Sequence, residues 1–307
     1  MKTEDARLLC AVLGSEAAAG VTENICRVFG CAAEEPRDFC LLETGMTNRS
    51  FVFSLRGEKF VYRHPGPDPE NPIGRANEKR SLEIARDLGL DPVFLYAGGE
   101  AGWVISRYVE DFREPDYRSA ADTRRVLAAL RKLHAAPVRT DYGLRPWEDG
   151  LRLEAQIRRL APDAFLPWEG FREKIRRLYA QTQDDGVEKC FCHGDTYKPN
   201  WLLRDTGETI LIDWEYAGTA DPGVDLGYYI VDAMYGVEEA EALIREYLGD
   251  ACDEARMFHF LAYTAIIAYY WFCWALLREV RGIDNNGALE RWRDMAIRYA
   301  EHLLPEG

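Results

Sequence analysis

Residues 189–216 have the sequence KCFCHGDTYKPNWLLRDTGETILIDWEY, and this stretch decides the fold. Two short apolar runs lead to acidic residues, the first to Asp195 and the second to Asp213, and the polar residues 204–208 lie between the runs. The pattern predicts two strands joined by a turn, each delivering one carboxylate to the same edge, with Asn200 beside them. Two carboxylates and an amide at one edge are what a divalent cation and a proton acceptor require.

Composition and charge exclude some classes of protein. The 307 residues suffice for two lobes or one large domain, and a hydrophobic fraction of 47% supplies a sizeable core. The net charge of -14 argues against a nucleic-acid binder, which needs a basic surface. The same charge is compatible with a cationic substrate and equally with an ordinary acidic protein of the cytoplasm.

The cysteines favour a reducing compartment. The 8 Cys include no C-x-x-C pair, so a zinc site is not expected, and a chain of this length needs no disulfide scaffold. Cys190 and Cys192 are two apart and share one face of a strand, which indicates core packing rather than metal ligation. The acidic N-terminus lacks the apolar core of a signal peptide, so we expect a cytoplasmic protein.

One apolar segment raises the question of a membrane. Residues 257–277 carry no formal charge if His259 is neutral, and they are long enough to span a bilayer. Their Tyr and Trp residues lie in the middle, whereas membrane spans carry these residues at the ends. The segment is therefore predicted to be a buried core helix, with a membrane protein as the alternative.

The periodicity of apolar residues divides the chain into two parts. Strands are predicted at residues 39–42, 50–55, 59–63, 92–97 and 102–108, and a helix at 75–88. After residue 111 the pattern is mainly helical, apart from the opening stretch. The predicted organisation is an N-terminal lobe of residues 1–110, with N-terminal helices, about five antiparallel strands and one further helix, and a larger helical lobe of residues 111–307.

The spacing of polar residues in the opening stretch points to phosphoryl transfer. Asp195 and Asn200 have the spacing D-x-x-x-x-N, which phosphotransferases use to place a proton-accepting carboxylate beside a metal-binding amide. Asp213 would be the main ligand of Mg²⁺, which prefers oxygen atoms. No G-x-x-x-x-G-K-[ST] motif is present, so the chain is not a P-loop enzyme. The alternative is that Asp195 and Asp213 only cap turns.

The motifs HGDTYKPNWLL (residues 193–203) and LIDWEYAG (residues 211–218) resemble the choline/ethanolamine kinase family. The likeness is to its bacterial, LicA-like branch, within the aminoglycoside-phosphotransferase-like superfamily that shares the protein-kinase fold, and it runs from about residue 39 to 304. It implies an α+β, protein-kinase-like bilobal fold with ATP between the lobes. It also implies that Asp195 is the catalytic base, that Asn200 and Asp213 bind Mg²⁺, and that Glu215 lies near both.

The same resemblance extends to the nucleotide site. Residues 45–50 resemble the loop that covers the phosphates, whose N–H groups and hydroxyls contact phosphate oxygens. Arg63 resembles the cation that holds the α- and β-phosphates, with Glu78 as its partner, and the alternative is a surface salt bridge or solvated charges. The predicted ATP-binding residues are Thr47, Asn48, Arg63 and Glu78, together with Ser106 and Tyr108 of a hinge whose backbone binds adenine.

Aromatic residues near the C-terminus suggest the phosphate acceptor. Trp271 and Trp274 are three apart on a helix and hence on one face. Aromatic walls bind quaternary ammonium groups through cation–π attraction, and the W-x-x-W pair resembles the choline pocket of the family. The predicted pocket comprises Glu215, Asp232, Tyr235, Tyr270, Trp271, Trp274 and Trp292. An aromatic stripe at helical spacing is also what a hydrophobic core shows.

The residues and the resemblance together predict an ATP- and Mg²⁺-dependent kinase that phosphorylates the hydroxyl of choline. Ethanolamine, an aminoglycoside or another small alcohol is the alternative acceptor, and a non-catalytic choline-binding pseudokinase is the alternative outside enzymes. The predicted partner is a small cationic molecule, without nucleic acid or membrane insertion. Asp225 resembles a structural carboxylate that anchors the catalytic loop, and His134 is predicted to be a satisfied core or surface histidine and not a ligand.

Overall fold

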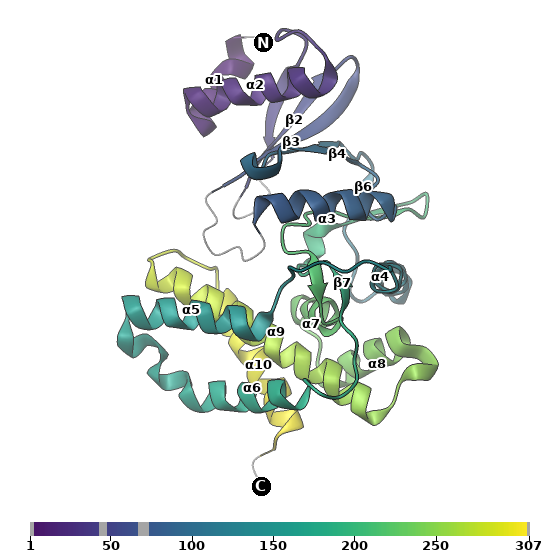
Figure 1. Ribbon diagram of the computed structural model, residues 1–307, viewed down its shortest axis with the longest axis vertical. Coiled ribbons are helices and arrows are strands. Elements are labelled where there is room, and N and C mark those ends of the chain that lie inside the picture. The colour runs from purple at the N-terminus through teal and green to yellow at the C-terminus, as the bar shows by residue number, and fades with distance from the viewer. Residues whose placement is uncertain (1–2, 43–47, 67–73, 306–307) are drawn as a thin grey trace. The chain divides into compact units, whose positions relative to one another are not determined.

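The computed structural model describes residues 3–42, 48–66 and 74–305, and the chain forms two compact units (Figure 1). The N-terminal unit comprises the chain up to Phe112 together with residues 204–210, and the C-terminal unit comprises residues 113–203 and 211–307. The tip of the hairpin in the opening stretch thus groups with the N-terminal unit, which the sequence pattern does not indicate.

The N-terminal unit is built on one antiparallel sheet of five strands in the order β1-β2-β3-β5-β4. The strands are β1 Arg37–Leu42, β2 Arg49–Leu55, β3 Glu58–His64, β4 Phe94–Ala97 and β5 Val104–Arg107. Arg56 and Gly57, with φ of 53° and 86°, join β2 to β3, because a two-residue turn with positive φ matches the twist of the strands. Helix α3 Arg75–Asp87 and the 3-10 turn η1 Gly99–Ala101 complete the predicted elements.

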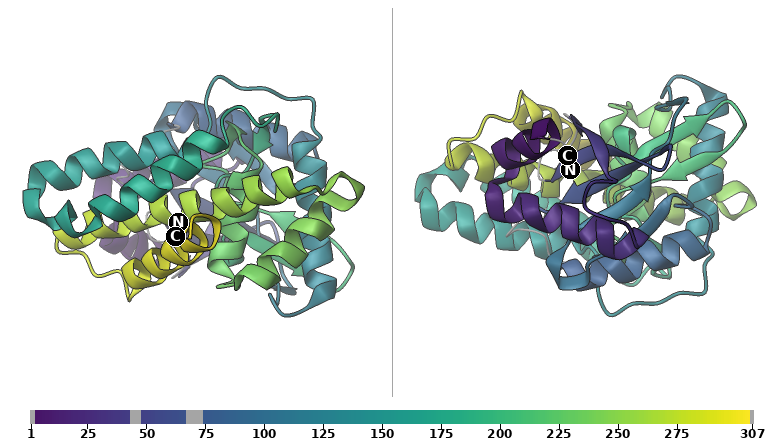
Figure 2. Two further views of the ribbon diagram at one scale, coloured as in Figure 1. Left: turned by 90° about the horizontal axis from the view of Figure 1, so that it is seen from below. Right: turned by 90° about the horizontal axis from the view of Figure 1, so that it is seen from above.

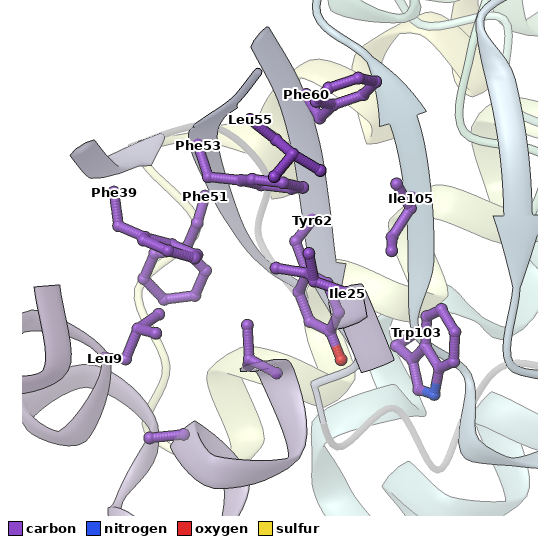
Figure 3. Close-up of a cluster of buried hydrophobic side chains, with 12 residues drawn as sticks. Leu9, Ile25, Phe39, Phe51, Phe53, Leu55, Phe60, Tyr62, Trp103 and Ile105 are labelled. Carbon is purple, nitrogen blue, oxygen red and sulfur yellow. The ribbon is translucent and has the colours of Figure 1, made fainter. Parts of the chain in front are cut away.

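Two helices cover one face of this sheet. Helices α1 Thr3–Leu13 and α2 Ser15–Phe29 precede β1, and Figure 3 shows Leu9 and Ile25 facing the rings of the sheet. Alternate residues of β2, Phe51 and Phe53 among them, point into this cluster because side chains alternate between the faces of a strand. The core of the unit is therefore aromatic on the sheet side.

The C-terminal unit consists mainly of helices around one buried helix, α9 Glu254–Val280. The others are α4 Ala120–His134, α5 Pro146–Leu160, α6 Glu169–Gln181, α7 Gly223–Asp232, α8 Val237–Leu248 and α10 Ala288–Leu303. The 3-10 turns are η2 Pro162–Trp168, η3 Lys198–Asn200 and η4 Gly249–Ala251. Helix α9 packs against α5, α6, α7, α8 and α10, and its course beside α5 is visible in Figure 2.

Helix α9 is the segment whose composition raised the question of a membrane. It is long and apolar enough to cross a bilayer, but its most apolar window is buried completely by the protein itself. Burial on all sides by other helices explains why it is apolar around its whole circumference. The structure thus gives α9 the environment of the predicted core helix.

The strands of the opening stretch pair differently from the prediction. β8 Trp201–Arg204 forms the hairpin with β9 Thr209–Leu211, whereas β7 Cys190–Cys192 pairs with β10 Gly218–Ala220. The expectation that the run before His193 and the run before Asp213 form one hairpin was therefore wrong. The apolar residues 201–203 lie directly before the turn, so they are closer to β9 along the chain than β7 is, and they pair with β9 instead. A further short strand, β6 Phe112–Arg113, lies where the chain passes from one unit to the other.

A buried histidine fastens the start of α7. His259 lies between two carboxylates, with Nε2 2.9 Å from Asp221 Oδ1 and Nδ1 2.5 Å from Asp185 Oδ2. Asp221 Oδ1 also accepts from the N–H of Gly223 at the first turn of α7, 2.8 Å away. Burial by itself lowers the pKa of His259, but the hydrogen bonds and charges of Asp221 and Asp185 outweigh it and raise the pKa above its ordinary value.

We predict that His259→Gln, which keeps hydrogen-bonding groups but removes the charge, lowers the free energy of unfolding in a pH-dependent way. Because the pKa of the native state is raised, the stabilising charge is fully present below pH 6.5, the ordinary value, and is lost as the pH rises through the native pKa. Below pH 6.5 the free energy of unfolding of the variant should be about 1.5–3 kcal/mol lower than that of the natural protein. Urea unfolding in buffers on either side of this range measures it, and a difference independent of pH contradicts the assignment.

Candidate active site

Residues 193–195 leave β7 through a turn that only glycine fits. Gly194 has φ of 83°, and a Cβ atom there would lie 2.6 Å from the backbone oxygen of Tyr216. Both the left-handed conformation and the close approach therefore exclude a side chain. The histidine before it is buried, and its Nε2 lies 3.0 Å from the backbone oxygen of Ile212, the residue before Asp213. The turn thus ties the two halves of the opening stretch together.

Asp225 on α7 anchors this turn. Its Oδ2 accepts from the N–H of His193 (2.9 Å) and its Oδ1 from the N–H of Gly194 (2.7 Å). His134 Nε2 lies 2.9 Å from Oδ2, and Tyr247 Oη lies 2.6 Å from the other ring nitrogen. Burial raises the pKa of Asp225, but the bonds and charges of its partners outweigh burial and lower it. The predicted anchoring role of Asp225, and the prediction of a satisfied histidine at position 134, are confirmed.

Asp195 follows the anchored turn and is held by Asn200. The amide nitrogen of Asn200 donates to the backbone oxygen of Asp195 (2.9 Å) and to its Oδ2 (3.0 Å). Oδ1 of Asp195 is buried and has no hydrogen-bond partner among the residues that the structure describes. Because the amide nitrogen of Asn200 is used in this way, its oxygen is the atom left to bind another group.

Three carboxylates gather at this point. Burial raises the pKa of Asp195 well above its usual range, and the negative charges of Asp213 and Glu215 add to the effect. Carboxylate oxygens of Asp213 and Glu215 lie within 4.8 Å of each other. Asp213 has a φ of 67°, and the N–H of Ile212 donates to the backbone oxygen of Asn200 at 2.9 Å. The structure therefore brings together the predicted catalytic and metal-binding residues of this unit, and Glu215 with them.

These residues fit Mg²⁺ by their chemistry. Oδ1 of Asp195 is a buried carboxylate oxygen with no hydrogen-bond partner in the described part of the chain, and the carboxylates of Asp213 and Glu215 lie close to each other. The ligand atoms are all oxygen, the type that Mg²⁺ prefers. Asn200 and Asp213 are the residues that would hold the ion, and Asp195 would remain beside it.

The predicted aromatic pocket forms a contiguous cluster of rings. Trp271 lies within 6 Å of the rings of Tyr270, Trp274 and Trp292, with centroid distances of 4.9, 5.7 and 5.6 Å. Trp271 also stacks on Tyr228 at 4.9 Å with 20° between the planes. These residues are the aromatic cluster. One ring in it already carries a cation of the protein, because the guanidinium of Arg278 lies 4.7 Å from the centroid of Trp274.

The two remaining predicted pocket residues belong to a second group. Asp232 Oδ2 accepts from the hydroxyl of Tyr117 and from the N–H of Lys198, the latter at 2.9 Å. The hydroxyl of Tyr235 donates to the backbone oxygen of Tyr117. Burial raises the pKa of Asp232, and the bonds to Tyr117 and Lys198 oppose this effect. Asp232 thus binds the backbone of Lys198, which lies between Asp195 and Asn200 in the predicted catalytic loop.

Tyr228 is the functional candidate that the sequence reasoning missed. Its hydroxyl lowers the pKa of the Asp195 carboxyl, against the effect of burial, while its ring stacks on Trp271. It is buried and joins the predicted base to the aromatic cluster. A signal was present, because Asp225, Tyr228 and Asp232 have the spacing i, i+3, i+7 and share one face of α7. Tyr117 carried no such signal.

In the N-terminal unit the predicted ion pair is present. Arg63 on β3 pairs with Glu78 on α3, whose carboxylate also binds Arg75 at 3.1 Å, and Glu78 is only 2% exposed. The alternative of a surface salt bridge does not fit this burial. Asn48 Oδ1 accepts from the N–H of Gly66 (3.2 Å) and from Arg75 Nη2 (3.4 Å). The predicted Thr47 lies outside the described residues.

The predicted adenine hinge is constrained by the sheet. Ser106 lies within β5, where it is paired with Val61 of β3. The N–H of Tyr108 donates to the backbone oxygen of Lys59 at 3.0 Å, and that of Arg107 to Val93 at 2.9 Å. The N-terminal unit itself therefore uses these N–H groups, and the predicted binding of adenine by the hinge stays a prediction.

Comparison with known proteins identifies the family and the fold of the chain. Residues 38–260 match the model of the phosphotransferase enzyme family. The chain is 24% identical over 276 residues to Protein LicA of Haemophilus influenzae, covering 84% of this chain and 79% of that protein. It is also 24% identical over 256 residues to the thiamine kinase of Escherichia coli strain K12, covering 81% of each.

Among solved structures, choline kinase LicA from Streptococcus pneumoniae superimposes with a TM-score of 0.78 at 23% identity, covering 94% of this chain and 100% of that one. The predicted α+β, protein-kinase-like fold is thereby confirmed. Because the match to the family model spans well over half of the chain and includes the anchored turn, Asn200 and Asp213, this protein belongs to the phosphotransferase enzyme family.

Proposed function

We propose that this protein is an ATP- and Mg²⁺-dependent kinase of small cationic alcohols, and that choline is its acceptor. The reaction moves the γ-phosphoryl group of ATP to the hydroxyl of choline and gives phosphocholine and ADP. The observation that carries the proposal is the position of Tyr228, which influences the pKa of Asp195 and stacks on Trp271 of the aromatic cluster. A carboxylate that accepts a proton and rings that bind a cation are thus joined by one side chain. The LicA relatives point in the same direction.

Each residue of the site has a defined task in this proposal. Asp195 Oδ1, which has no hydrogen-bond partner among the residues described, orients the acceptor hydroxyl and accepts its proton, while Asn200 keeps the carboxylate in place. Mg²⁺ bound by Asn200 and Asp213 supplies neutralisation of the phosphate charge. Arg63, aligned by Glu78, binds phosphate oxygens of the nucleotide. Most of the catalysis is then positioning and electrostatics. The protein would act in the cytoplasm, without nucleic acid or membrane insertion.

The alternative acceptors and the pseudokinase are less well supported. Ethanolamine has a primary ammonium group that needs hydrogen-bond acceptors, but Asp232 already accepts from Tyr117 and Lys198. Aminoglycosides carry several amines and favour a pocket of carboxylates, whereas this cluster is aromatic. A non-catalytic binding protein has no need of the buried Arg63–Glu78 pair or of an orphaned oxygen on Asp195.

One observation favours thiamine as a second candidate. The indole N–H of Trp271 is buried and has no hydrogen-bond partner among the residues that the structure describes. The trimethylammonium end of choline offers no acceptor for it, but the pyrimidine nitrogens of thiamine do. Thiamine also carries a cationic ring and a primary hydroxyl, and thiamine kinases are among the relatives.

The experiment that tests the proposal is ATP turnover against a panel of choline, ethanolamine, thiamine and an aminoglycoside, each with and without Mg²⁺. We expect choline to give the highest kcat/KM and omission of Mg²⁺ to abolish turnover, because the carboxylates then lack their cation. A clear preference for thiamine selects the second candidate. Absence of Mg²⁺-dependent stimulation by every acceptor would sink the small-molecule kinase assignment.

We predict that Asp195→Asn lowers kcat by at least about 100-fold, because it removes the proton acceptor. The folded state should be as stable as before or more stable, since burial and neighbouring charges disfavour the ionised form of Asp195. Asp213→Asn should also abolish Mg²⁺-dependent turnover. Thermal unfolding and steady-state kinetics measure both effects, and Asp205→Asn, in the exposed turn of the same hairpin, is the matched control. Near-normal kcat in Asp195→Asn contradicts the assigned base.

We predict that Trp271→Leu raises the KM for choline by about 2- to 30-fold, the equivalent of a cation–π contact of about 0.5–2 kcal/mol, and leaves the KM for ATP unchanged. Trp274→Leu should have a smaller effect because one face of that ring is held by Arg278. Steady-state kinetics on both variants, with melting temperatures as a control for folding, measures this. If both KM values rise together, Trp271 acts as core and does not contact the acceptor.

A further inference from the structure

Two thiols and an imidazole lie together behind the catalytic turn. Cys190 and Cys192 point to the same side of β7, with their sulfurs 3.6 Å apart, and they are 5% and 1% exposed. His134 on α4 brings a ring nitrogen to them, so that all three ligand atoms lie within 4.8 Å of one another. The sequence pattern indicated core packing here, because the third member is far away along the chain. The structure adds that member.

The geometry matches the demands of a tetrahedral metal ion. Zinc–sulfur bonds of about 2.3 Å at a tetrahedral angle separate the two sulfurs by about 3.8 Å, close to the 3.6 Å between Cys190 and Cys192. Thiolate and imidazole ligands select Zn²⁺ and similar thiophilic ions, whereas Mg²⁺ binds oxygen atoms. The hydrogen bond from Cys192 lowers the pKa of Cys190, whereas burial and the contact with Cys190 raise the pKa of Cys192. A metal ion must therefore displace at least the proton of Cys192 when it binds.

We propose that Cys190, Cys192 and His134 form a binding site for a thiophilic divalent ion of the Zn²⁺ class. Binding releases the two thiol protons to solvent and leaves the carboxylate group at Asp195 and Asp213 to Mg²⁺. This inference does not depend on which alcohol is the acceptor. It rests on ligand atoms that are already gathered in the folded protein.

The surroundings of His134 also fit a metal ligand. A metal-bound histidine usually donates its other ring N–H to a carboxylate, and His134 already contacts Asp225 in this way. The metal ion would then bind Nδ1 of His134 and replace the contact of that nitrogen with the hydroxyl of Tyr247. Asp225 accepts from the N–H groups of His193 and Gly194 and also contacts His134. Two successive hydrogen bonds therefore connect an ion bound by His134 to the catalytic turn. We therefore expect Zn²⁺ to lower kcat reversibly, with recovery on adding a chelator.

The test is a titration of the full chain, in buffer containing Mg²⁺, with Cd²⁺ as the probe. We expect one equivalent to produce the ultraviolet charge-transfer band of a cadmium–thiolate bond. The band should disappear in Cys190→Ser/Cys192→Ser and persist in Cys26→Ser/Cys31→Ser, a matched control that removes another hydrogen-bonded thiol pair. His134→Gln should weaken the affinity at least about tenfold, as loss of groups around a metal does.

A second measurement covers the case in which the double variant does not fold. X-ray absorption of the natural protein loaded with one equivalent of Zn²⁺ should show two sulfurs at about 2.3 Å and at least one nitrogen at about 2.0–2.1 Å. Coordination by oxygen alone, or a cadmium band that is lost in the Cys26/Cys31 variant and kept in the Cys190/Cys192 variant, overturns the proposal. So does the absence of any stoichiometric band.

Discussion

The buried carboxylate of Asp225 is the constraint on which the catalytic turn depends. A charge that is fully buried is costly unless it is paired, and Asp225 is paired with two backbone N–H groups and an imidazole. Those N–H groups belong to His193 and Gly194, so the direction of Asp195 follows from a residue on another element. Removing the Asp225 carboxylate would leave two backbone N–H groups unpaired, and removing its partners would leave a buried charge unpaired. Each change costs free energy in a buried place.

The anchored turn holds negative charge close together instead of dispersing it. The charges of Asp213 and Glu215 disfavour the ionised form of Asp195, and φ of 67° at Asp213 adds backbone strain. A structure selected for stability alone would not gather carboxylates in this way. The gain comes when a cation and phosphates are bound, because the charges are then already in position and no further reorganisation is needed. The gathered carboxylates thus lower the stability of the folded protein without ligands, and in return the site is preorganised for a cation and phosphates.

The sequence predicted those parts of the fold and site that depend on short spacing. Asp195 with Asn200 and the five-stranded sheet follow from local patterns, and they lie where expected. The pairing of β7 with β10 and the role of Tyr117 could not be predicted, because Tyr117 meets Asp232 across 115 residues of sequence. Such contacts are set by helix packing, which a local pattern does not encode. Tyr228 lies between the two cases, since its helical spacing from Asp225 was visible.

The position of Tyr228 limits what the acceptor can be. Tyr228 is near enough to lower the pKa of Asp195, and its ring centroid lies 4.9 Å from that of Trp271, so about one side chain separates the proposed base from the aromatic cluster. A cation is attracted within about 6 Å of a ring centroid. A substrate that places its hydroxyl at Asp195 and its positive charge at Trp271 must therefore be short. Choline, with two carbons between oxygen and nitrogen, meets this limit directly. Thiamine carries a second ring that needs further room, and the buried indole N–H of Trp271, which has no hydrogen-bond partner in the described part of the chain, is the group that could bind that ring.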